Sequence, residues 1–400
     1  MIKGRDIIAI GLQPWDSKIA FTNKYTVIEM SKNNRILFIN PPLQRSALLR
    51  EKHKPEVQKR IRILKGKEAD LVQYNENLWI LYPRTVVESI NWIKSATIFN
   101  FFNKINDKRF AKQIKIAADK LNFKDFLLFN DNSMINGFYL KELLKPKMFI
   151  YLLRDAVIHV AYHKRHGTRL QPLIIKKADF AVANSDYFAD YCRQTNPRSF
   201  MIGQGCDLSM YNDSDGKLKI PEDLLAVKKK PIIGYVGVLT TIRLDIEILI
   251  HIAKQRPDWS LVLVGPEDKK FQNSKLHQLS NVYFLGRKDP ETLAAYIKGF
   301  DVTLNPQIVN IITDINYPLK IDEYLAMGKP VVATKTTFMT YFKDSTYLPS
   351  TKEEYVIEID KALKEDSQKL MNHRLKVAAS HSWGHFVEKI YDQIEEVEKT

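Results

Sequence analysis

Short apolar runs alternate along the chain with segments whose apolar residues recur at helical spacing. In the first half the runs predict buried strands at residues 7–11, 35–39, 78–82, 126–129, 148–152, 180–183 and 199–202. Helical patterns fit between several of them, including residues 110–121 and 174–178. Strands that alternate with helices are typical of α/β domains built on parallel sheets.

The alternation breaks near Asp207 and then resumes. Residues 211–217 are polar and rich in turn formers, as expected of a linker. Beyond them a second set of strands is predicted at 232–238, 260–264, 282–285, 301–304 and 331–333. A last helix is expected at about 383–395. The pattern therefore predicts two α/β domains, which suits a chain of 400 residues.

The segment 318–334 carries the most specific chemistry. It predicts a helix with Pro318 at its first position and Gly328 just past its end, followed by a buried strand. Lys320 and Glu323 are three residues apart, so they share one face near the helix N-terminus. That terminus and the lysine favour an anion, and the glutamate can accept hydrogens from hydroxyl groups. Phosphate together with ribose is what a nucleotide-sugar offers.

The amino-acid composition limits the class of protein and the cellular compartment that can be expected. With 45% hydrophobic and 27% charged residues, the chain can bury full cores and is not disordered. Only Cys192 and Cys206 are present, so no disulfide framework is predicted, which is compatible with a reducing cytoplasm. No apolar run is long enough for a membrane span, and the run at 7–11 is too short for a signal peptide.

The net charge of +15 predicts an anionic partner. Basic residues concentrate at 45–67, and residues 86–102 then place Trp, Ile and Phe beside lysines. This combination is typical of a surface that meets acyl chains and anionic headgroups. Nucleic acid is the less favoured partner, because the chain has no aromatic-platform or helix-turn-helix signature.

The segment 318–334 resembles the donor-site signature of retaining glycosyltransferases of the GT-B fold, in family four (group 1). Pro14-Trp15-Asp16 resembles a loop of a bacterial surface-polysaccharide, teichuronic-acid-like subgroup. The resemblance implies an α/β GT-B architecture, with two Rossmann-like domains facing a central cleft. An acceptor domain would span residues 1–207, with helix 383–400 packing back on it. A linker at 208–230 would lead to a nucleotide-sugar domain at 231–382.

The resemblance also assigns roles to residues. Lys320 would contact the donor diphosphate and Glu323 the ribose, with Gly237 and Arg243 beside the diphosphate. Further expected contacts are Gly286 and Arg287 for the base, and Trp15, Asp16 and Asp155 for the acceptor. The catalytic set is Asp155, Arg243 and Lys320. The donor phosphate itself is expected to take the acceptor proton, while Asp155 orients or polarises the acceptor.

The activity implied is transfer of a hexose-type sugar, with retention, from a nucleotide-diphosphate donor to a glycan or lipid-linked acceptor in cell-surface polysaccharide synthesis. No metal or other cofactor is expected, because Arg243, Lys320 and helix N-termini can neutralise the leaving diphosphate. The expected location is cytoplasmic, peripheral on the inner face of the cell membrane.

Other interpretations stay open. Many relatives carry a first glutamate eight residues before the second, and here that position is Ile315. Its absence favours an inactive, nucleotide-binding or scaffold subunit, unless Asp314 or Asn316 substitutes. A sugar-nucleotide epimerase of the same fold and a nucleic-acid binder are further alternatives. Two metal sites are weaker ones: Asp213-Ser-Asp215 in the linker, and His159 with His163 at helical spacing.

Overall fold

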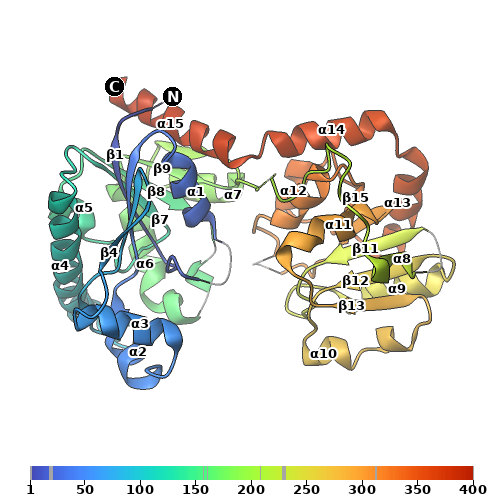
Figure 1. Cartoon of the computed structure of the whole chain (residues 1–400), viewed down its shortest axis with the longest axis horizontal. Coiled ribbons are helices and arrows are strands. Elements are labelled where there is room, and N and C mark those ends of the chain that lie inside the picture. The colour runs from blue at the N-terminus through green and yellow to red at the C-terminus, as the bar shows by residue number, and fades with distance from the viewer. Residues whose placement is uncertain are drawn as a thin grey trace. The chain divides into compact units, whose positions relative to one another are not determined.

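A computed structural model describes residues 2–17, 21–155, 157–159, 161–207, 209–227, 231–310 and 313–399. The chain divides into two compact units. One consists of Met1–Gly205 together with Trp383–Thr400, and the other is Cys206–Ser382 (Figure 1). Each unit is a sheet with helices packed against it, so the predicted α/β class is confirmed.

The first unit is built on an eight-stranded sheet with strand order β10-β9-β8-β7-β1-β2-β5-β4. Every neighbouring pair is parallel except β4 and β5. The strands are β1 (Asp6–Gly11), β2 (Arg35–Ile39), β4 (Leu71–Asn75), β5 (Leu78–Leu81), β7 (Leu127–Asp131), β8 (Met148–Leu153), β9 (Phe180–Ala183) and β10 (Ser199–Met201). All seven predicted strands are present. The antiparallel edge strand β4 was missed, because most of it is exposed and it lacks an apolar run.

The helices of this unit include several that the sequence showed only in part. They are α1 (Thr22–Met30), α2 (Arg45–Arg50), α3 (Pro55–Leu64), α4 (Ala96–Lys120), α5 (Leu140–Leu144), α6 (Ala161–Lys177), α7 (Asp186–Arg193) and α15 (Trp383–Lys399). Two-residue strands β3 (Leu43–Gln44) and β6 (Val86–Val87) pair with each other. The helix predicted at 110–121 is the second half of α4, which begins where the Ser95 side chain accepts a hydrogen bond from Ile98 N.

The last helix, α15, belongs to the first unit. Its apolar face, including Phe386 and Ile390, lies in the same core cluster as the sheet strands. The Trp383 ring stacks on Tyr25 of α1 with 5.4 Å between ring centroids. A side chain at Gly205 would lie 2.1 Å from the Trp383 ring, so only glycine allows this close approach.

The second unit has a five-stranded parallel sheet with order β13-β12-β11-β14-β15. The strands are β11 (Ile232–Val236), β12 (Ser260–Val264), β13 (Val282–Gly286), β14 (Val302–Asn305) and β15 (Val331–Ala333). All five were predicted. The helices are α8 (Glu222–Leu225), α9 (Ile246–Gln255), α10 (Lys269–Gln272), α11 (Leu293–Lys298), α12 (Leu319–Ala326), α13 (Lys352–Glu365) and α14 (Gln368–Ala379). Short 3-10 turns complete the two units at Val157–His159, Lys275–Gln278, Pro290–Thr292 and Phe338–Phe342.

The segment expected to act as a linker takes part in the second unit. Tyr211, Leu224 and Val227 are buried in its core cluster, and Leu224 belongs to α8. This unit begins at Cys206, before the segment that was expected to be a linker. The polar turn around Asp213 is held by an ion pair between Asp213 and Lys298 at 2.6 Å.

Candidate donor and acceptor sites

In the second unit, the carboxyl ends of β11 and β12 meet through two glycines. Gly237 and Gly265 have φ values of 143° and 149°, which side chains rarely adopt. A Cβ at Gly265 would lie 1.8 Å from the carbonyl oxygen of Gly237. Gly237 N in turn donates to Val264 O at 2.8 Å. The two strand ends are therefore packed backbone against backbone, and this edge of an open parallel sheet is where ligands bind.

Lys320 lies directly over this glycine backbone. A Cβ at Gly237 would be 2.2 Å from Lys320 Nζ, and Nζ is 5.3 Å from the centre of the Tyr235 ring. In the described part of the chain, no carboxylate forms an ion pair with the ammonium. Pro318 caps α12 instead of occupying its first position, so Lys320 is the second residue of the helix. The positive end of the helix and this ammonium thus converge beside the glycine backbone, which favours a phosphate.

Glu323 is on the same helix and is partly buried. Burial raises the pKa of its carboxyl group, while the charge of Lys320 and a hydrogen bond from Tyr211 oppose the rise. Burial and the nearby Glu323 charge raise the pKa of Tyr211, so its hydroxyl stays a donor. The remaining lone pairs of the carboxylate can accept hydrogens from ligand hydroxyl groups.

The other predicted donor residues differ in their surroundings at this edge of the sheet. Arg243 is exposed, in the turn before α9, whose start is capped by Asp245. Its charge opposes the burial that raises the pKa of Tyr235, as does Lys320, so both cations act near one ring. Gly286 at the end of β13 pairs with Val264 after a shift in strand register, and Arg287, which follows it, is exposed to solvent. The structure thus brings Gly237, Lys320, Arg243 and Glu323 near Tyr235, and leaves Arg287 exposed.

A buried apolar residue occupies the position where many relatives carry the first glutamate. Ile315 is buried. Asp314 is committed to a turn, because its two carboxylate oxygens accept hydrogen bonds from Thr337 N at 2.7 Å and Thr337 Oγ1 at 2.8 Å. Asn316 has a buried Oδ1 with no protein partner in the described residues. Of the two residues considered as substitutes, Asn316 is therefore the one with an acceptor atom to spare.

A buried polar cluster behind α12 was missed by sequence reasoning. Asp322 is fully buried and accepts hydrogen bonds from Tyr317 OH at 2.6 Å and from His381 Nδ1 at 2.7 Å. His381 Nε2 lies 3.1 Å from Tyr341 OH, and its backbone carbonyl accepts from Cys206 N at 2.7 Å. Burial raises the pKa of Asp322, and His381 opposes the rise. The cluster fixes α12, and with it Lys320 and Glu323, against the chain segments that enter and leave this unit.

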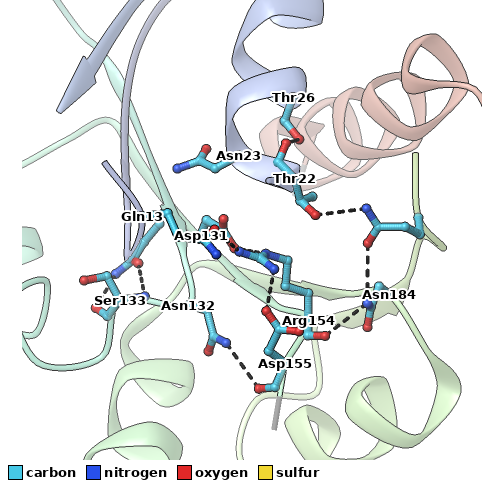
Figure 2. A network of polar contacts seen from close by, with 12 residues as sticks. Gln13, Thr22, Asn23, Thr26, Asp131, Asn132, Ser133, Arg154, Asp155 and Asn184 are labelled. Carbon is cyan, nitrogen blue, oxygen red and sulfur yellow. Dashed lines mark hydrogen bonds and ion pairs between the residues drawn. The ribbon is translucent and has the colours of Figure 1, made fainter. Parts of the chain in front are cut away.

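In the first unit, polar side chains collect at the carboxyl ends of the strands around Arg154 (Figure 2). Arg154 Nε donates to Asp131 Oδ1 at 2.8 Å, Nη1 donates to Asp155, and Nη2 donates to Gln13 Oε1 at 3.1 Å. Asn132 Nδ2 donates to the Asp155 carbonyl oxygen at 3.2 Å. Burial raises the pKa of Asp131, and Arg154 opposes the rise. Asp155, at 43% side-chain exposure, is the carboxylate of this network that solvent reaches.

Three acceptor atoms near this network have no protein partner in the described residues. They are Asn23 Oδ1, Asp131 Oδ2 and Asn184 Oδ1, and all three side chains are buried. Figure 2 shows them on separate elements: Asn23 on α1, Asp131 at the end of β7 and Asn184 after β9. Asn184 Nδ2 also donates to the Arg154 carbonyl oxygen at 3.1 Å. Unpaired acceptors beside a neutralised arginine suit a ligand that donates from hydroxyl groups.

Trp15 and Asp16 make contacts outside this network. The Trp15 ring is buried in the core, at 5.2 Å from Phe38 and 4.9 Å from Tyr74 between ring centroids. Asp16 forms an ion pair with Lys59 at 3.0 Å and lines a surface cavity. The indole is thus a packing group here, whereas the Asp16 carboxylate lies where a ligand can reach it.

The metal alternatives gain no support from geometry. In the described residues no three His, Cys, Asp or Glu side chains are grouped to hold an ion. Asp213 and Asp215 pair with Lys298 and Lys217, and the placement of the His159 side chain lies outside what is described.

No helix in the described residues is long and apolar enough to cross a membrane.

Comparisons with known proteins find similarity to glycosyltransferases. Residues 230–365 match the family model "Glycosyl transferases group 1". Over 169 residues the chain is 28% identical to the "Putative teichuronic acid biosynthesis glycosyltransferase TuaH" of Bacillus subtilis (strain 168). That stretch covers 40% of this chain and 41% of the relative, so less than half of the curated protein is matched.

Solved structures match the whole chain. Sucrose-phosphate synthase from Thermosynechococcus elongatus is similar with a TM-score of 0.65 and 18% identity, over 99% of this chain and 100% of that one. Anabaena Alr3699/HepE in complex with UDP is similar with a TM-score of 0.64 and 14% identity, over 98% and 100%. The fold is therefore that of the GT-B glycosyltransferases. The segment 230–365 is therefore similar to a group 1 glycosyltransferase domain.

Proposed function

We propose that this protein transfers a sugar from a nucleotide-diphosphate donor, with retention, to a glycan or lipid-linked acceptor in cell-surface polysaccharide synthesis. The observation that carries the proposal is the position of Lys320, which lies over the Gly237 backbone at the start of α12 and has no ion-pair partner among the described residues. The group 1 match covers this segment, and a structural relative was solved with UDP. The curated relative is named for teichuronic acid biosynthesis, which supports the polysaccharide setting.

In this proposal the donor lies in the second unit. Lys320 and Arg243 neutralise the diphosphate as it leaves, so the reaction needs no metal for that purpose. Glu323 accepts from the ribose hydroxyls, and the backbone beyond Gly286 and Arg287 holds the base. The acceptor lies in the first unit, where Asp155 orients the attacking hydroxyl while the donor phosphate takes its proton.

The test is turnover. The protein is incubated with UDP-, GDP-, ADP- and dTDP-sugars and a panel of saccharide and lipid-phosphate acceptors. Release of nucleoside diphosphate and the anomeric configuration of the product are followed by NMR. We expect one donor base to be turned over with retention, and Lys320→Ala to abolish it while the exposed Lys269→Ala control does not. Inverted product would contradict the mechanism.

A second candidate is a subunit that binds nucleotide without turnover. The buried Ile315 at the position of the first glutamate, and the commitment of Asp314 to Thr337, favour it. It predicts nucleotide binding that depends on Lys320, with no diphosphate release from any donor and acceptor pair.

We also propose that the first unit contacts an anionic membrane surface. Trp92, Ile98 and Phe101 are 71%, 51% and 62% exposed, and Lys94 and Lys104 are exposed beside them in the sequence. Exposed aromatic and aliphatic side chains next to lysines suit the headgroup region. Such contact would keep the protein at the inner face of the cell membrane. Anionic liposomes should sediment the protein at low salt, and failure to do so would contradict this part.

A further inference from the structure

A two-part groove runs along the surface of the first unit. Its inner cavity, of about 480 Å³, and its outer cavity, of about 670 Å³, are each of the size that small ligands occupy. The two adjoin, because both are lined by Gln44, Ser46, Arg50 and Tyr162. The groove is formed by elements of this unit alone, chiefly α2, α3 and the loop after β2.

The inner cavity is largely apolar. Its apolar walls are made by Leu12, Pro14, Pro42, Leu43, Ala47 and Val57. Two of its carboxylates are already neutralised, since Asp16 pairs with Lys59 and Glu51 with Lys54. A third, Glu56, is exposed to solvent. The cavity therefore offers apolar surface that a hydrocarbon chain of the right width would cover.

One cation stands at the wall of this inner cavity without a counter-ion. Burial lowers the pKa of Arg60 to about 10. Its Nη2 donates to Pro41 O at 2.8 Å, and the guanidinium lies 5.3 Å from the centre of the Tyr82 ring. Within the described residues no carboxylate forms an ion pair with it. Arg60 is half-buried, and the nearby charge of Asp16 opposes the effect of burial on its pKa, so its charge is partly balanced within the cavity wall.

The outer cavity is basic. Arg45, Arg50 and Arg165 line it, against Glu88 as its acidic residue. Glu88 is held by Arg45 through two hydrogen bonds of 2.6 and 2.7 Å, and this contact lowers the pKa of Glu88 to about 2. Arg165 Nη1 donates only to the backbone carbonyls of Asn91 and Trp92, and Arg50 has no ion pair among the described residues. Two arginines are thus available for an anion.

The rim of the outer cavity is apolar and exposed. Leu49 is 78% and Trp92 71% exposed, and both line the cavity. The Trp92 ring is held in place by a hydrogen bond from its Nε1 to Ser89 O at 2.7 Å. The groove therefore presents an exposed apolar rim, a cavity lined by arginines and an adjoining cavity with apolar walls.

We propose that this groove binds a phosphate ester of a long-chain alcohol, with the phosphate between Arg50 and Arg165 and the chain in the inner cavity. Charge complementarity selects the phosphate, and the apolar walls select the chain. Calling this ligand the carrier of the acceptor rests on the proposed glycosyltransferase function, whereas its binding does not. No residue of the groove belongs to the nucleotide site of the second unit.

The test measures binding of decyl phosphate, below its critical micelle concentration, by isothermal titration calorimetry. Decanol and inorganic phosphate serve as the chain alone and the anion alone. We expect decyl phosphate to bind at least tenfold more tightly than either. The double variant Arg50→Gln/Arg165→Gln should weaken it at least tenfold. The control Lys52→Gln/Lys67→Gln removes the same charge from exposed positions outside the groove and should leave the affinity unchanged.

A second variant tests the chain. Ala47→Trp places an indole in the inner cavity and should weaken decyl phosphate binding at least tenfold. Unchanged affinity in this variant, or an equal loss in the lysine control, would overturn the proposal. So would vesicles of phosphatidylglycerol that compete with decyl phosphate equally well in wild type and Ala47→Trp, because a headgroup alone would then be the ligand. The thermal shift given by nucleotides should be the same in all variants, which separates failure here from failure of the donor site.

Discussion

In both units the candidate site lies at the carboxyl edge of a parallel sheet. The polar groups at the two edges, however, differ in charge and in hydrogen-bonding capacity. In the second unit the edge is backbone and cation: Gly237 and Gly265 in close contact, with Lys320 lacking a counter-ion in the described residues. In the first unit the cation Arg154 is neutralised by Asp131 and Asp155. What remains there is a set of unpaired acceptor atoms.

This difference indicates what each edge can bind. A helix N-terminus and an ammonium without a counter-ion in the described residues are suited to a diphosphate. A neutralised arginine would gain little from an anion, whereas the carboxylate and amide oxygens around it can accept hydrogen bonds from hydroxyl groups. The contrast supports donor binding in the second unit and acceptor binding in the first, and it can be tested by changing one edge at a time.

The largest effect is expected from removing the central cation of the first unit. Arg154→Met leaves Asp131 buried without its partner, which should cost about 3–5 kcal/mol of unfolding free energy. Chemical denaturation measures this. Adding Asp131→Asn removes the stranded charge, and this double variant should recover much of the loss. If the single variant were as stable as wild type, the network would not be the structural element described.

Next in size is the glycine contact of the second unit. Gly265→Ala forces a Cβ into the Gly237 carbonyl at a strained φ and should lower the unfolding free energy by about 3 kcal/mol. Gly286→Ala is the matched control, because its φ is also positive, at 67°, but open space surrounds it. That substitution should cost only about 1 kcal/mol. Equal melting temperatures for the two variants would contradict the packed strand ends.

Asp155→Asn should separate the two edges functionally. The exposed carboxylate is proposed to orient the acceptor, so its loss should slow transfer by about 10- to 100-fold. Nucleotide affinity should stay at the wild-type value, because Asp155 is absent from the donor edge. A fall in nucleotide affinity with unchanged turnover would reverse the assignment. Steady-state kinetics with calorimetry on the same preparations measures both quantities.

The smallest effect concerns pH. Burial raises the pKa of Glu323, and its carboxylate form is the one proposed to accept from ribose. As pH falls through this raised pKa the carboxylate is lost, so nucleotide affinity should weaken about tenfold at a pH above that of an ordinary carboxyl group. Glu323→Gln should abolish this pH dependence. In Lys320→Ala the midpoint should move to higher pH, because Lys320 opposes the rise.

Sequence reasoning predicted the elements correctly where the pattern is contiguous. Lys320 and Glu323 lie on one helix, as expected, and most strands of both sheets are short apolar runs. It failed where a site is assembled from separate strands: Asp131 is the last residue of β7 and Arg154 follows β8, so their ion pair has no local signature. The polar triplet Asn130-Asp131-Asn132 directly after an apolar run was the available signal.

Two other misses have physical causes. His381 is 59 residues from Asp322, and nothing local distinguishes a histidine that supports a helix from one in solvent. Trp15 was expected at the acceptor, but its ring packs on Phe38, since a tryptophan in a loop after a strand can equally fill the core. Backbone contacts such as that between Gly237 and Gly265 depend on sheet register, which the sequence indicates only through glycine itself.

The central claim is that the edge under α12 is a diphosphate site and the edge around Arg154 is not. The most direct measurement is calorimetric titration of UDP, GDP, ADP and dTDP into wild type, Lys320→Met and Asp155→Asn. The account predicts selective binding of one base by wild type and Asp155→Asn, and at least a 100-fold loss in Lys320→Met. Binding that survives in Lys320→Met, or that is lost in Asp155→Asn, would contradict it.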